Sequence, residues 1–457
     1  MRTTLTKLKL LFITPLMLLQ VQNTSAQSMP LDKYIEQGIQ ENRVLQQKQI
    51  AIEKAMIALD QAKALFLPTI DFQAGYQSGA GGRSISIPVG DLMNPVYSTL
   101  NQLTSSNRFP QISNSENYFL PNNFLDGKVI TTMPLYNSEL RFNKQIQGQQ
   151  QQIRETDLAL YKRELVKDIK VAYYNYCAAE NAIRIYDNAL QLVAEAQRTN
   201  EKLLANGKGL PAYVLRAQSE VENMRAKLNE AQQQSTNAKL YFNFLLNSKA
   251  DQPIDTTLQL TEEQLNATVS LPAAAREENK LWAQQVQLQQ TVLKMKQAFA
   301  LPKINAFVNS GAQAEQLKFN SKSFYYIAGL QLEIPLFHGK KNLLQIKQTQ
   351  LDLKQSQIAQ EDTKQQLELS NQISRNQFNS KKTNYHAAQK VAEASAAYQR
   401  LIDKGFKEGV NSFIETIDAR TQHIQAQLQV NNSWYQLLIA AAQLERSLAT
   451  YTYSTQK

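Results

Sequence analysis

The feature that most constrains this chain is an internal repeat. Pro68 lies in the segment ALFLPTI, and Pro302 lies in the similar segment FALPKI. Pro134 in MPLY likewise matches Pro335 in IPLF. The first pair of prolines is 234 residues apart and the second pair is 201 residues apart. A repeat of this length predicts one structural unit that occurs twice, with about 33 extra residues inside the first copy.

The first copy, residues 27–247, changes its hydrophobic period along the chain. Apolar residues at spacings of three, four and seven favour a helix, which Pro68 ends. Strict alternation then favours strands, and the region between them is rich in Gly, Ser, Asn and Pro, as surface insertions are. The expected elements are a helix over 31–66, strands over 68–77 and 128–136, an insertion over 78–123 and a long helical hairpin over 137–247.

The second copy, residues 273–451, follows a mixed linker over 248–272. Its second strand has the clearest alternation in the sequence, with aromatic and aliphatic residues at every other position from Phe324 to Ile334. The expected elements are a helix over 273–301, strands over 303–311 and 323–336, a helical hairpin over 338–451 and a tail over 452–457.

The N-terminus has the pattern of an export signal. Arg2, Lys7 and Lys9 accompany an apolar stretch, and small residues ending at Ala26 offer a cleavage site. We therefore expect a signal peptide over 1–26. The apolar stretch is too short for a membrane-spanning helix, and no later stretch reaches about 18 apolar residues. We expect an exported chain without a transmembrane helix.

Composition and motifs argue against several function classes. The net charge is +10, but basic residues alternate with acidic ones along the expected helices, so we expect no nucleic-acid partner. Cys177 is the only cysteine and is expected to be a small core residue. The histidines are scattered, and no zinc, phosphate-loop or nucleophile motif occurs. We expect no enzymatic activity, no metal and no cofactor.

Strands that are apolar on one face, in an exported chain, favour an outer-membrane β-barrel. Four strands cannot close such a barrel, because about eight is the lower limit and lipid does not tolerate open sheet edges. Several chains would have to contribute strands. Helices about 100 Å long would project into an aqueous compartment. A soluble sheet packed on helices is the alternative that these patterns leave open.

With these elements in order, the sequence resembles the TolC-like outer-membrane efflux proteins over essentially the whole mature chain. The resemblance depends on the paired proline segments and on the turns Gly207…Ala217 and Gly409…Ala419. It implies a mainly α fold with a small transmembrane β part, built from two repeats of helix, strand, strand and long helical hairpin. It also implies a homotrimer in which a 12-stranded β-barrel continues into a 12-helix α-barrel.

The resemblance further implies the exit duct of a tripartite efflux or type I secretion-like system. Such a duct lies in the outer membrane of a Gram-negative bacterium and extends far into the periplasm. Its partners are a periplasmic adaptor (membrane fusion) protein and an inner-membrane pump of the RND, ABC or MFS class. The insertion 78–123 would then be extracellular. The competing interpretation is a non-channel periplasmic coiled-coil protein, structural or adaptor, although the compact turn-rich domain of an adaptor is missing from the sequence.

By the same resemblance, Glu415 and Asp418 take the acidic positions that ring the periplasmic constriction. They are three residues apart and share a helix face, where like charges raise each other's pKa and attract cations. Ser412-x-x-Glu415 is also a capping box, so a role confined to the helix N-terminus is the alternative.

The ionic lock of the family is altered in this sequence. Its arginine position holds Asn411 and its acidic position holds Tyr213, which leaves at most a hydrogen bond between these two residues. Phe406 and Phe413 offer apolar closure instead.

Two further sets of residues are candidates for contacts outside the chain. The turn glycines are candidates for adaptor docking, because the tips would reach farthest from the membrane, and a left-handed turn conformation is the alternative: Gly207, Gly209, Gly405 and Gly409. The apolar face of the strands is expected to meet membrane lipid through Phe72, Tyr76, Phe324, Tyr326, Leu330 and Leu332.

Overall fold

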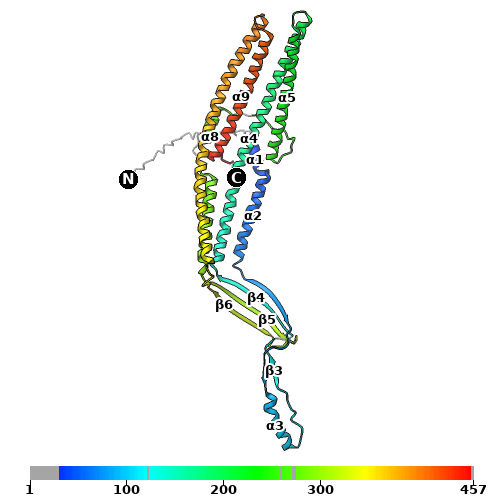
Figure 1. Ribbon diagram of the computed structural model, residues 1–457, viewed down its shortest axis with the longest axis vertical. Coiled ribbons are helices and arrows are strands. Elements are labelled where there is room, and N and C mark those ends of the chain that lie inside the picture. Colours follow the sequence, from blue (N-terminus) through cyan, green and yellow to red (C-terminus); the bar gives the residue numbers. More distant parts are fainter. Residues whose placement is uncertain (1–29, 121–122, 258–259, 270–273, 454–457) are drawn as a thin grey trace, which may run out of the picture.

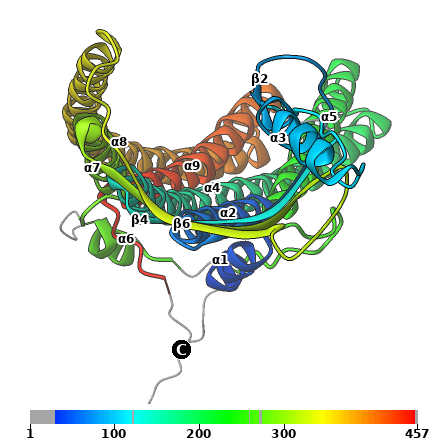
Figure 2. The ribbon, with the colours of Figure 1, turned by 90° about the horizontal axis from the view of Figure 1, so that it is seen from below.

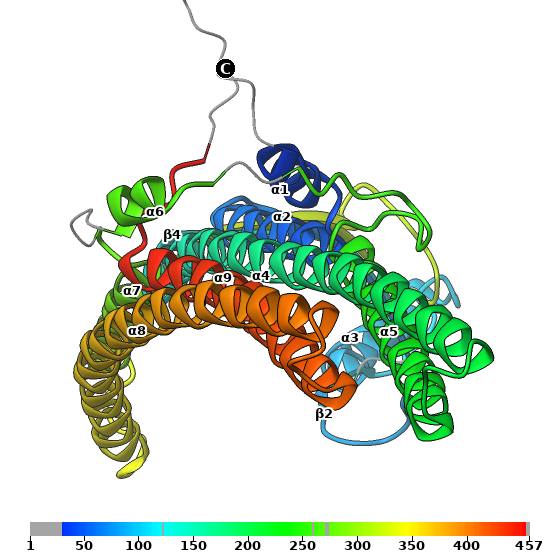
Figure 3. The same cartoon turned by 90° about the horizontal axis from the view of Figure 1, so that it is seen from above.

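The computed structural model describes residues 30–453 except 121–122, 258–259 and 270–273. The molecule is elongated, with long helices at one end, a curved sheet next to them and a small insertion at the far end (Figure 1). Seen along its long axis, the chain follows an arc with one concave side (Figures 2 and 3). The expected signal peptide over 1–26 lies outside the described residues.

Two long hairpins dominate the helical part. They consist of α4 (Ser138–Ala205) with α5 (Pro211–Leu245), and of α8 (Lys341–Lys407) with α9 (Phe413–Leu448). With 68 and 67 residues, α4 and α8 are each about 100 Å long. Shorter helices pack beside them: α1 (Pro30–Glu41), α2 (Arg43–Ala64), α7 (Glu277–Gln297) and a 3-10 turn (Ala298–Ala300). Within the described residues, no helix is both long and apolar enough to cross a membrane.

The prediction of one continuous helix over 31–66 is wrong, because the chain breaks at Asn42. This residue is extended, with φ −63° and ψ 124°, and its side-chain oxygen caps α2 by accepting the N–H groups of Val44 and Leu45. Its Nδ2 donates to the Leu245 carbonyl at 3.1 Å. The break separates α1, which packs on α4, from α2. The predicted linker 248–272 is likewise not all irregular, since it contains α6 (Glu262–Val269).

The sheet has four antiparallel strands in the order β1 (Thr69–Gln77), β4 (Phe124–Tyr136), β5 (Lys303–Glu315) and β6 (Phe324–Glu333). Three predicted bounds need correction. The strands predicted over 128–136 and 303–311 are longer, because β4 and β5 pair as far as Phe124 and Glu315. The strand predicted over 323–336 ends at Glu333, before Pro335, which has no N–H to donate. β1 and β6 form the two open edges of the sheet.

The register separates two chemically different faces of the sheet. Phe72, Val129, Ser310 and Tyr326 lie side by side in one row. The next row along the strands is Gln73, Lys128, Gly311 and Tyr325, which projects from the opposite face because side chains alternate along a strand. On that polar face Tyr325 donates a hydrogen bond to Asp126 at 2.9 Å, and Lys128 pairs with Asp126 at 3.1 Å.

The insertion between β1 and β4 is an ordered unit rather than an irregular loop. It contains β2 (Ser84–Ile87), α3 (Val89–Thr104) and β3 (Ser115–Tyr118). β2 and β3 form a separate two-stranded antiparallel sheet. The unit extends beyond the end of the main sheet, away from the long helices (Figure 1).

The largest core lies midway along the helical part, where α1, α4, α5 and α9 meet, and we call it the central belt. Tyr34 and Phe242 meet edge to face there with ring centroids 5.2 Å apart. The belt is formed by fully buried side chains that include Ile35, Leu165, Ile169, Tyr173, Phe242, Leu246, Leu437, Leu438 and Leu444.

Ion pairs join the helices around the central belt. Arg446 of α9 donates to Glu164 of α4 and to Glu278 of α7, both at 2.9 Å. Arg163 of α4 pairs with Glu277 of α7 at 2.5 Å. Burial opposes the charged form of Glu278, but the hydrogen bond from Arg276 and the charge of Arg446 outweigh it and hold the pKa of Glu278 at about 2. The belt therefore connects helices from both halves of the chain.

Candidate functional site

The tips of the two hairpins lie together at the end of the molecule farthest from the sheet (Figure 1). Each turn contains a glycine in the left-handed region, Gly207 with φ 69° and Gly409 with φ 77°. The other two turn glycines lie close to neighbouring atoms, which are backbone at Gly209 and a side chain at Gly405. A Cβ on Gly209 would lie 2.7 Å from the backbone of the preceding helix, and one on Gly405 would lie 1.9 Å from the Asn411 amide oxygen. Gly207, Gly209 and Gly409 thus have a local structural reason.

Aromatic residues connect the two hairpins at the tips, and we call this group the tip cluster. Phe413 of α9 is buried, and its ring lies 5.3 Å from that of Tyr213 in α5 and 6.2 Å from that of Phe406 in α8. Ala217 and Ile417 complete the tip cluster and are also buried. Two of the residues expected at the gate, Tyr213 and Phe406, therefore meet Phe413 in one apolar contact.

The acidic residues lie beside this cluster on the first turns of α9. Glu415 accepts the backbone N–H of Ser412 at 2.6 Å, and its own N–H donates to the Ser412 hydroxyl, which completes the capping box. The Ser412 N–H, followed by the Asn411 amide, lowers the pKa of Glu415. Asp418 is exposed, and its carboxylate makes no hydrogen bond or ion pair with any described residue. Capping thus accounts for Glu415 but not for Asp418.

The hydrogen bond considered between Asn411 and Tyr213 does not form. Asn411 Nδ2 donates instead to Glu415 at 3.3 Å, because the two residues face each other across the first turn of α9. Tyr213 is partly buried and packs its ring on Phe413. The link between the hairpins at this position is therefore apolar.

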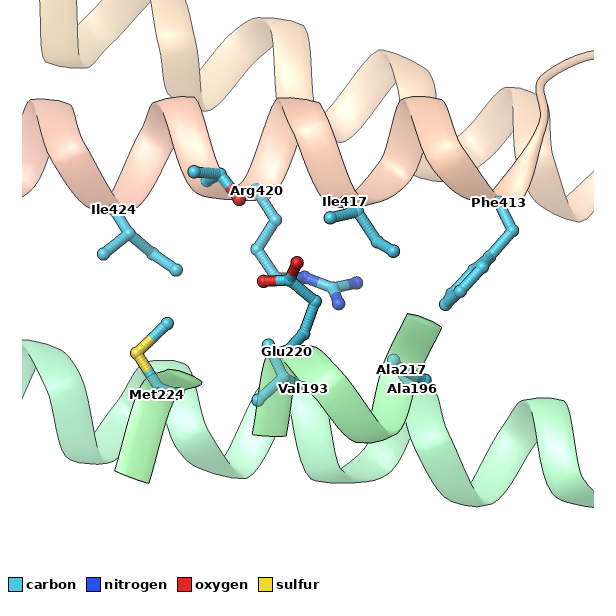
Figure 4. A pocket seen from close by; sticks show the side chains of 10 residues that line it. Val193, Ala196, Ala217, Glu220, Met224, Phe413, Ile417, Arg420 and Ile424 are labelled. Atoms are coloured by element: carbon cyan, nitrogen blue, oxygen red, sulfur yellow. The ribbon is translucent and has the colours of Figure 1, made fainter. Parts of the chain in front are cut away.

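A small cavity between α4, α5 and α9 contains a feature that the sequence analysis missed (Figure 4). Arg420 points into it beside Glu220, between Ile417 and Ile424. The Nε atom of Arg420 is buried without a hydrogen-bond partner among the described residues. Burial lowers the pKa of this guanidinium, and the charge of Asp403 offsets only part of that effect. Glu220 is already paired with Arg216 at 2.8 Å.

A sequence signal for Arg420 was present. Phe413, Ile417 and Ile424 mark the apolar stripe of α9, and position 420 falls on the same stripe at the spacing of a helix. A charged residue on such a stripe predicts a polar group buried between helices. The cavity is small, at about 10 Å³, so it offers room for about one water molecule.

The six residues expected to face lipid lie on one face of the sheet by register. Each is exposed in the single chain, with between 57% and 80% of its surface accessible. Exposed aromatic and aliphatic side chains on a contiguous face indicate contact with lipid or with another protein. They are Phe72, Tyr76, Phe324, Tyr326, Leu330 and Leu332.

The fold is similar to that of solved outer-membrane channels. The Campylobacter jejuni CmeC channel superimposes with a TM-score of 0.75 at 14% identity, covering 94% of this chain and 87% of CmeC. The Neisseria gonorrhoeae MtrE channel gives 0.72 at 15% identity, covering 94% and 91%. The outer membrane protein VceC of Vibrio cholerae gives 0.72 at 14% identity, covering 92% and 95%. No curated protein matches the sequence.

The sequence itself matches the family model described as outer membrane efflux protein. The match covers residues 34–248 and 270–450, which include both long hairpins and all four strands of the main sheet. It confirms the resemblance that the paired proline segments and the turns indicated. The chain therefore belongs to the outer membrane efflux protein family.

Proposed function

We propose that this protein is the outer-membrane exit duct of a tripartite efflux or type I secretion-like system. It would conduct substrates passively from a periplasmic adaptor and an inner-membrane pump to the exterior. The observation that carries the proposal is a curved sheet with an apolar face and two open edges, continuous with helices about 100 Å long. The family match and the likeness to solved channels support the same function.

The sheet supports a trimeric barrel in the outer membrane of a Gram-negative bacterium. From Phe324 to Leu332, β6 spans about 26 Å at 3.3 Å per residue, close to the height of the apolar band of outer-membrane barrels. Lipid does not tolerate the open edges β1 and β6, so β6 of one copy would pair with β1 of the next. Three copies of four strands make 12, and their long helices would continue as a 12-helix barrel in the periplasm.

The hairpin tips support closure of the duct at its periplasmic end. In the trimer, the tip clusters would hold the hairpins together, and Glu415 with Asp418 would place six carboxylates around the axis. The turns at Gly207 and Gly409 reach farthest from the sheet and are the proposed docking points for the adaptor. A pump of the RND, ABC or MFS class would supply the substrate. The duct performs no bond chemistry, and the described residues contain no cluster suited to a metal ion.

Single-channel conductance in planar bilayers tests this proposal. We expect a trimeric pore of low conductance, blocked by divalent cations added on the periplasmic side. The Glu415→Ala/Asp418→Ala variant should lose that block, with Glu408→Ala, an exposed acidic residue before the second turn, as the matched control. A pore that is unchanged by the double substitution would leave both residues without a role in the pore. No conductance from a well-folded sample would favour the non-channel coiled-coil protein.

A further inference from the structure

Within the insertion between β1 and β4, one side of helix α3 is covered by the segment that follows it. The segment 105–114 runs back along α3 as a strap. Asn94 donates to the Ile112 carbonyl and accepts its N–H, at 3.0 and 2.9 Å. Asn101 makes the same two-way contact with Phe109, at 2.8 and 3.1 Å. Both backbone groups of two strap residues are thus held by side-chain amides of the helix.

The start of the helix is fastened to the end of the strap. Asn114 accepts the N–H groups of Gly90 and Asp91 at 3.0 and 3.1 Å, and its Nδ2 donates to the Asp91 carboxylate at 2.9 Å. The strap lies so close that a Cβ on Gly90 would meet the Ile112 carbonyl at 2.4 Å. The ring of Tyr97 packs on Phe109 at 5.7 Å. The side of α3 that carries residues 90, 94, 97 and 101 is therefore fully engaged.

The opposite side of α3 is an apolar stripe that is exposed in the single chain, most strongly at Leu92 and Leu103. Its members recur at spacings of three, four and seven, as one face of a helix requires. Leu92 is 69% exposed and Leu103 is 78% exposed. The stripe, which we call the α3 stripe, consists of Val89, Leu92, Val96 and Leu103.

The chemistry of α3 does not suit a lipid surface. Helices that lie on membranes carry lysine and arginine on their polar face. Asp91 is the only charged residue of α3, and its carboxylate is already used by Asn114. A purely apolar stripe on a nearly uncharged helix fits best against another apolar stripe, because water is then removed from both.

The position of the insertion identifies the source of that second stripe. Seen from either end of the long axis, α3 and β2 lie on the concave side of the arc (Figures 2 and 3). The insertion therefore leans over the space that three copies would enclose. It also follows β1, the open edge where a neighbouring copy would pair. The α3 stripe thus continues the interface between copies beyond the end of the sheet.

We propose that the α3 stripes of three copies pack against one another over the outer mouth of the duct and form an extracellular cover. The proposal rests on the proposed trimeric duct and adds a second constriction at its outer end. The two-way asparagine contacts hold each helix rigidly enough to present the stripe. Because the same stripe occurs in every copy, rotation about the axis brings apolar side chains to apolar side chains.

Cysteine cross-linking in the purified full-length protein tests the proposal. Cys177 is buried, and burial raises the pKa of its thiol to about 12, so it stays unreactive and each variant carries one reactive cysteine, the introduced one. Leu103→Cys should form intermolecular disulfides under mild oxidation at least about tenfold faster than Ser98→Cys. Ser98 is the matched control, since it is exposed on the polar side of the same helix. Leu92→Cys is a second stripe position with the same expected result.

The outcomes separate this proposal from the proposed function. Trimers that conduct ions but show equal or no cross-linking at the stripe positions would overturn the cover and leave the duct. Quenching of a fluorophore on Leu103→Cys by quencher-labelled lipid would show that the stripe lies in the bilayer and would also overturn the cover. A monomer that shows no conductance would overturn both. Exposed positions are used throughout, so loss of folding is not expected.

Discussion

The central belt and the hairpin tips are joined by the same helices but are held together differently. At the belt, buried aromatic and aliphatic side chains are reinforced by ion pairs between helices, such as Arg446 with Glu164 and Glu278. At the tips, the ion pairs Arg216–Glu220 and Lys404–Glu408 each join residues four apart in the same hairpin. Among the described residues, the hairpins are connected there by apolar contacts, namely the small tip cluster and the neighbouring group of Val193, Met224 and Ile424. The comparison indicates that the central belt is rigid and that the hairpin tips can separate without unfolding of the whole protein.

The largest expected loss of stability follows a substitution in the core of the central belt. Phe242 is fully buried against Tyr34 and Tyr173, so Phe242→Ala should destabilise the protein by about 3–5 kcal/mol. The loss would appear as a lower midpoint in denaturation followed by circular dichroism. Phe244→Ala, on the same helix but exposed, should change the midpoint far less. Equal effects of the two substitutions would contradict a core concentrated at the belt.

The second-largest loss of stability is expected when the ion pairs around the central belt are broken. Arg446→Met would leave Glu164 and Glu278 without one cation, at a cost of about 2–3 kcal/mol. The folded pKa of Glu278, about 2, lies below its ordinary 4.5, so its contribution is present above pH 4.5 and is lost as pH falls toward 2. Losing Arg446 raises that pKa, and the acid-unfolding midpoint should move to higher pH. Arg198→Met, at an exposed arginine, should leave the midpoint in place.

The tip cluster should respond locally. Phe413→Ala removes the contact with Tyr213 and Phe406, so hydrogen exchange should speed up at residues 206–213 and 408–413. The global unfolding midpoint should change less than in Phe242→Ala, and the pore should open more often. Phe413→Leu keeps an apolar contact and should lie between Phe413→Ala and the unmodified protein. Global destabilisation as large as at Phe242 would remove the distinction between belt and tip.

The smallest effect is expected at the cap of α9. Ser412→Ala removes the hydroxyl that accepts the Glu415 N–H and should cost the helix start about 1 kcal/mol. The Ser412 N–H still holds Glu415, whose lowered pKa keeps it ionised until the pH falls below its ordinary value of 4.5. Cation block should therefore persist at pH 5 in this variant, measured as block against pH. Loss of block at pH 5 would contradict a role of the Glu415 charge in the block, because even a glutamate at its ordinary pKa of 4.5 is mostly ionised at that pH.

Local sequence signals predicted much of the fold. The strand faces followed from alternation, because apolar residues such as Phe72 and Leu332 each lie between two polar neighbours in the sequence. The long hairpins followed from helical stretches without proline between glycine turns. These features depend on residues close together in the sequence, so a single sequence was sufficient.

Features that depend on distant partners could not be predicted. The break at Asn42 is stabilised by the Leu245 carbonyl, 203 residues away. Arg446 and Glu164 are separated by 282 residues, and either could equally have been a solvated helix residue. The tip cluster was partly foreseen, since Phe406, Phe413 and Tyr213 were singled out, but their mutual packing required the hairpins to be placed side by side. Arg420 differs from these, because its place on the apolar stripe of α9 is a local signal that the sequence analysis did not use.

The two open sheet edges also determine an order of events in biogenesis. A lone copy would expose the unpaired backbone groups of β1 and β6 to hydrocarbon, at several kcal/mol for each group. In the proposed trimer, insertion into the membrane therefore cannot precede the meeting of three copies. Its rate should rise steeply with the periplasmic concentration of the chain, unlike that of a barrel closed within one polypeptide. Low expression would then leave soluble chains waiting for partners rather than a proportionally smaller number of ducts.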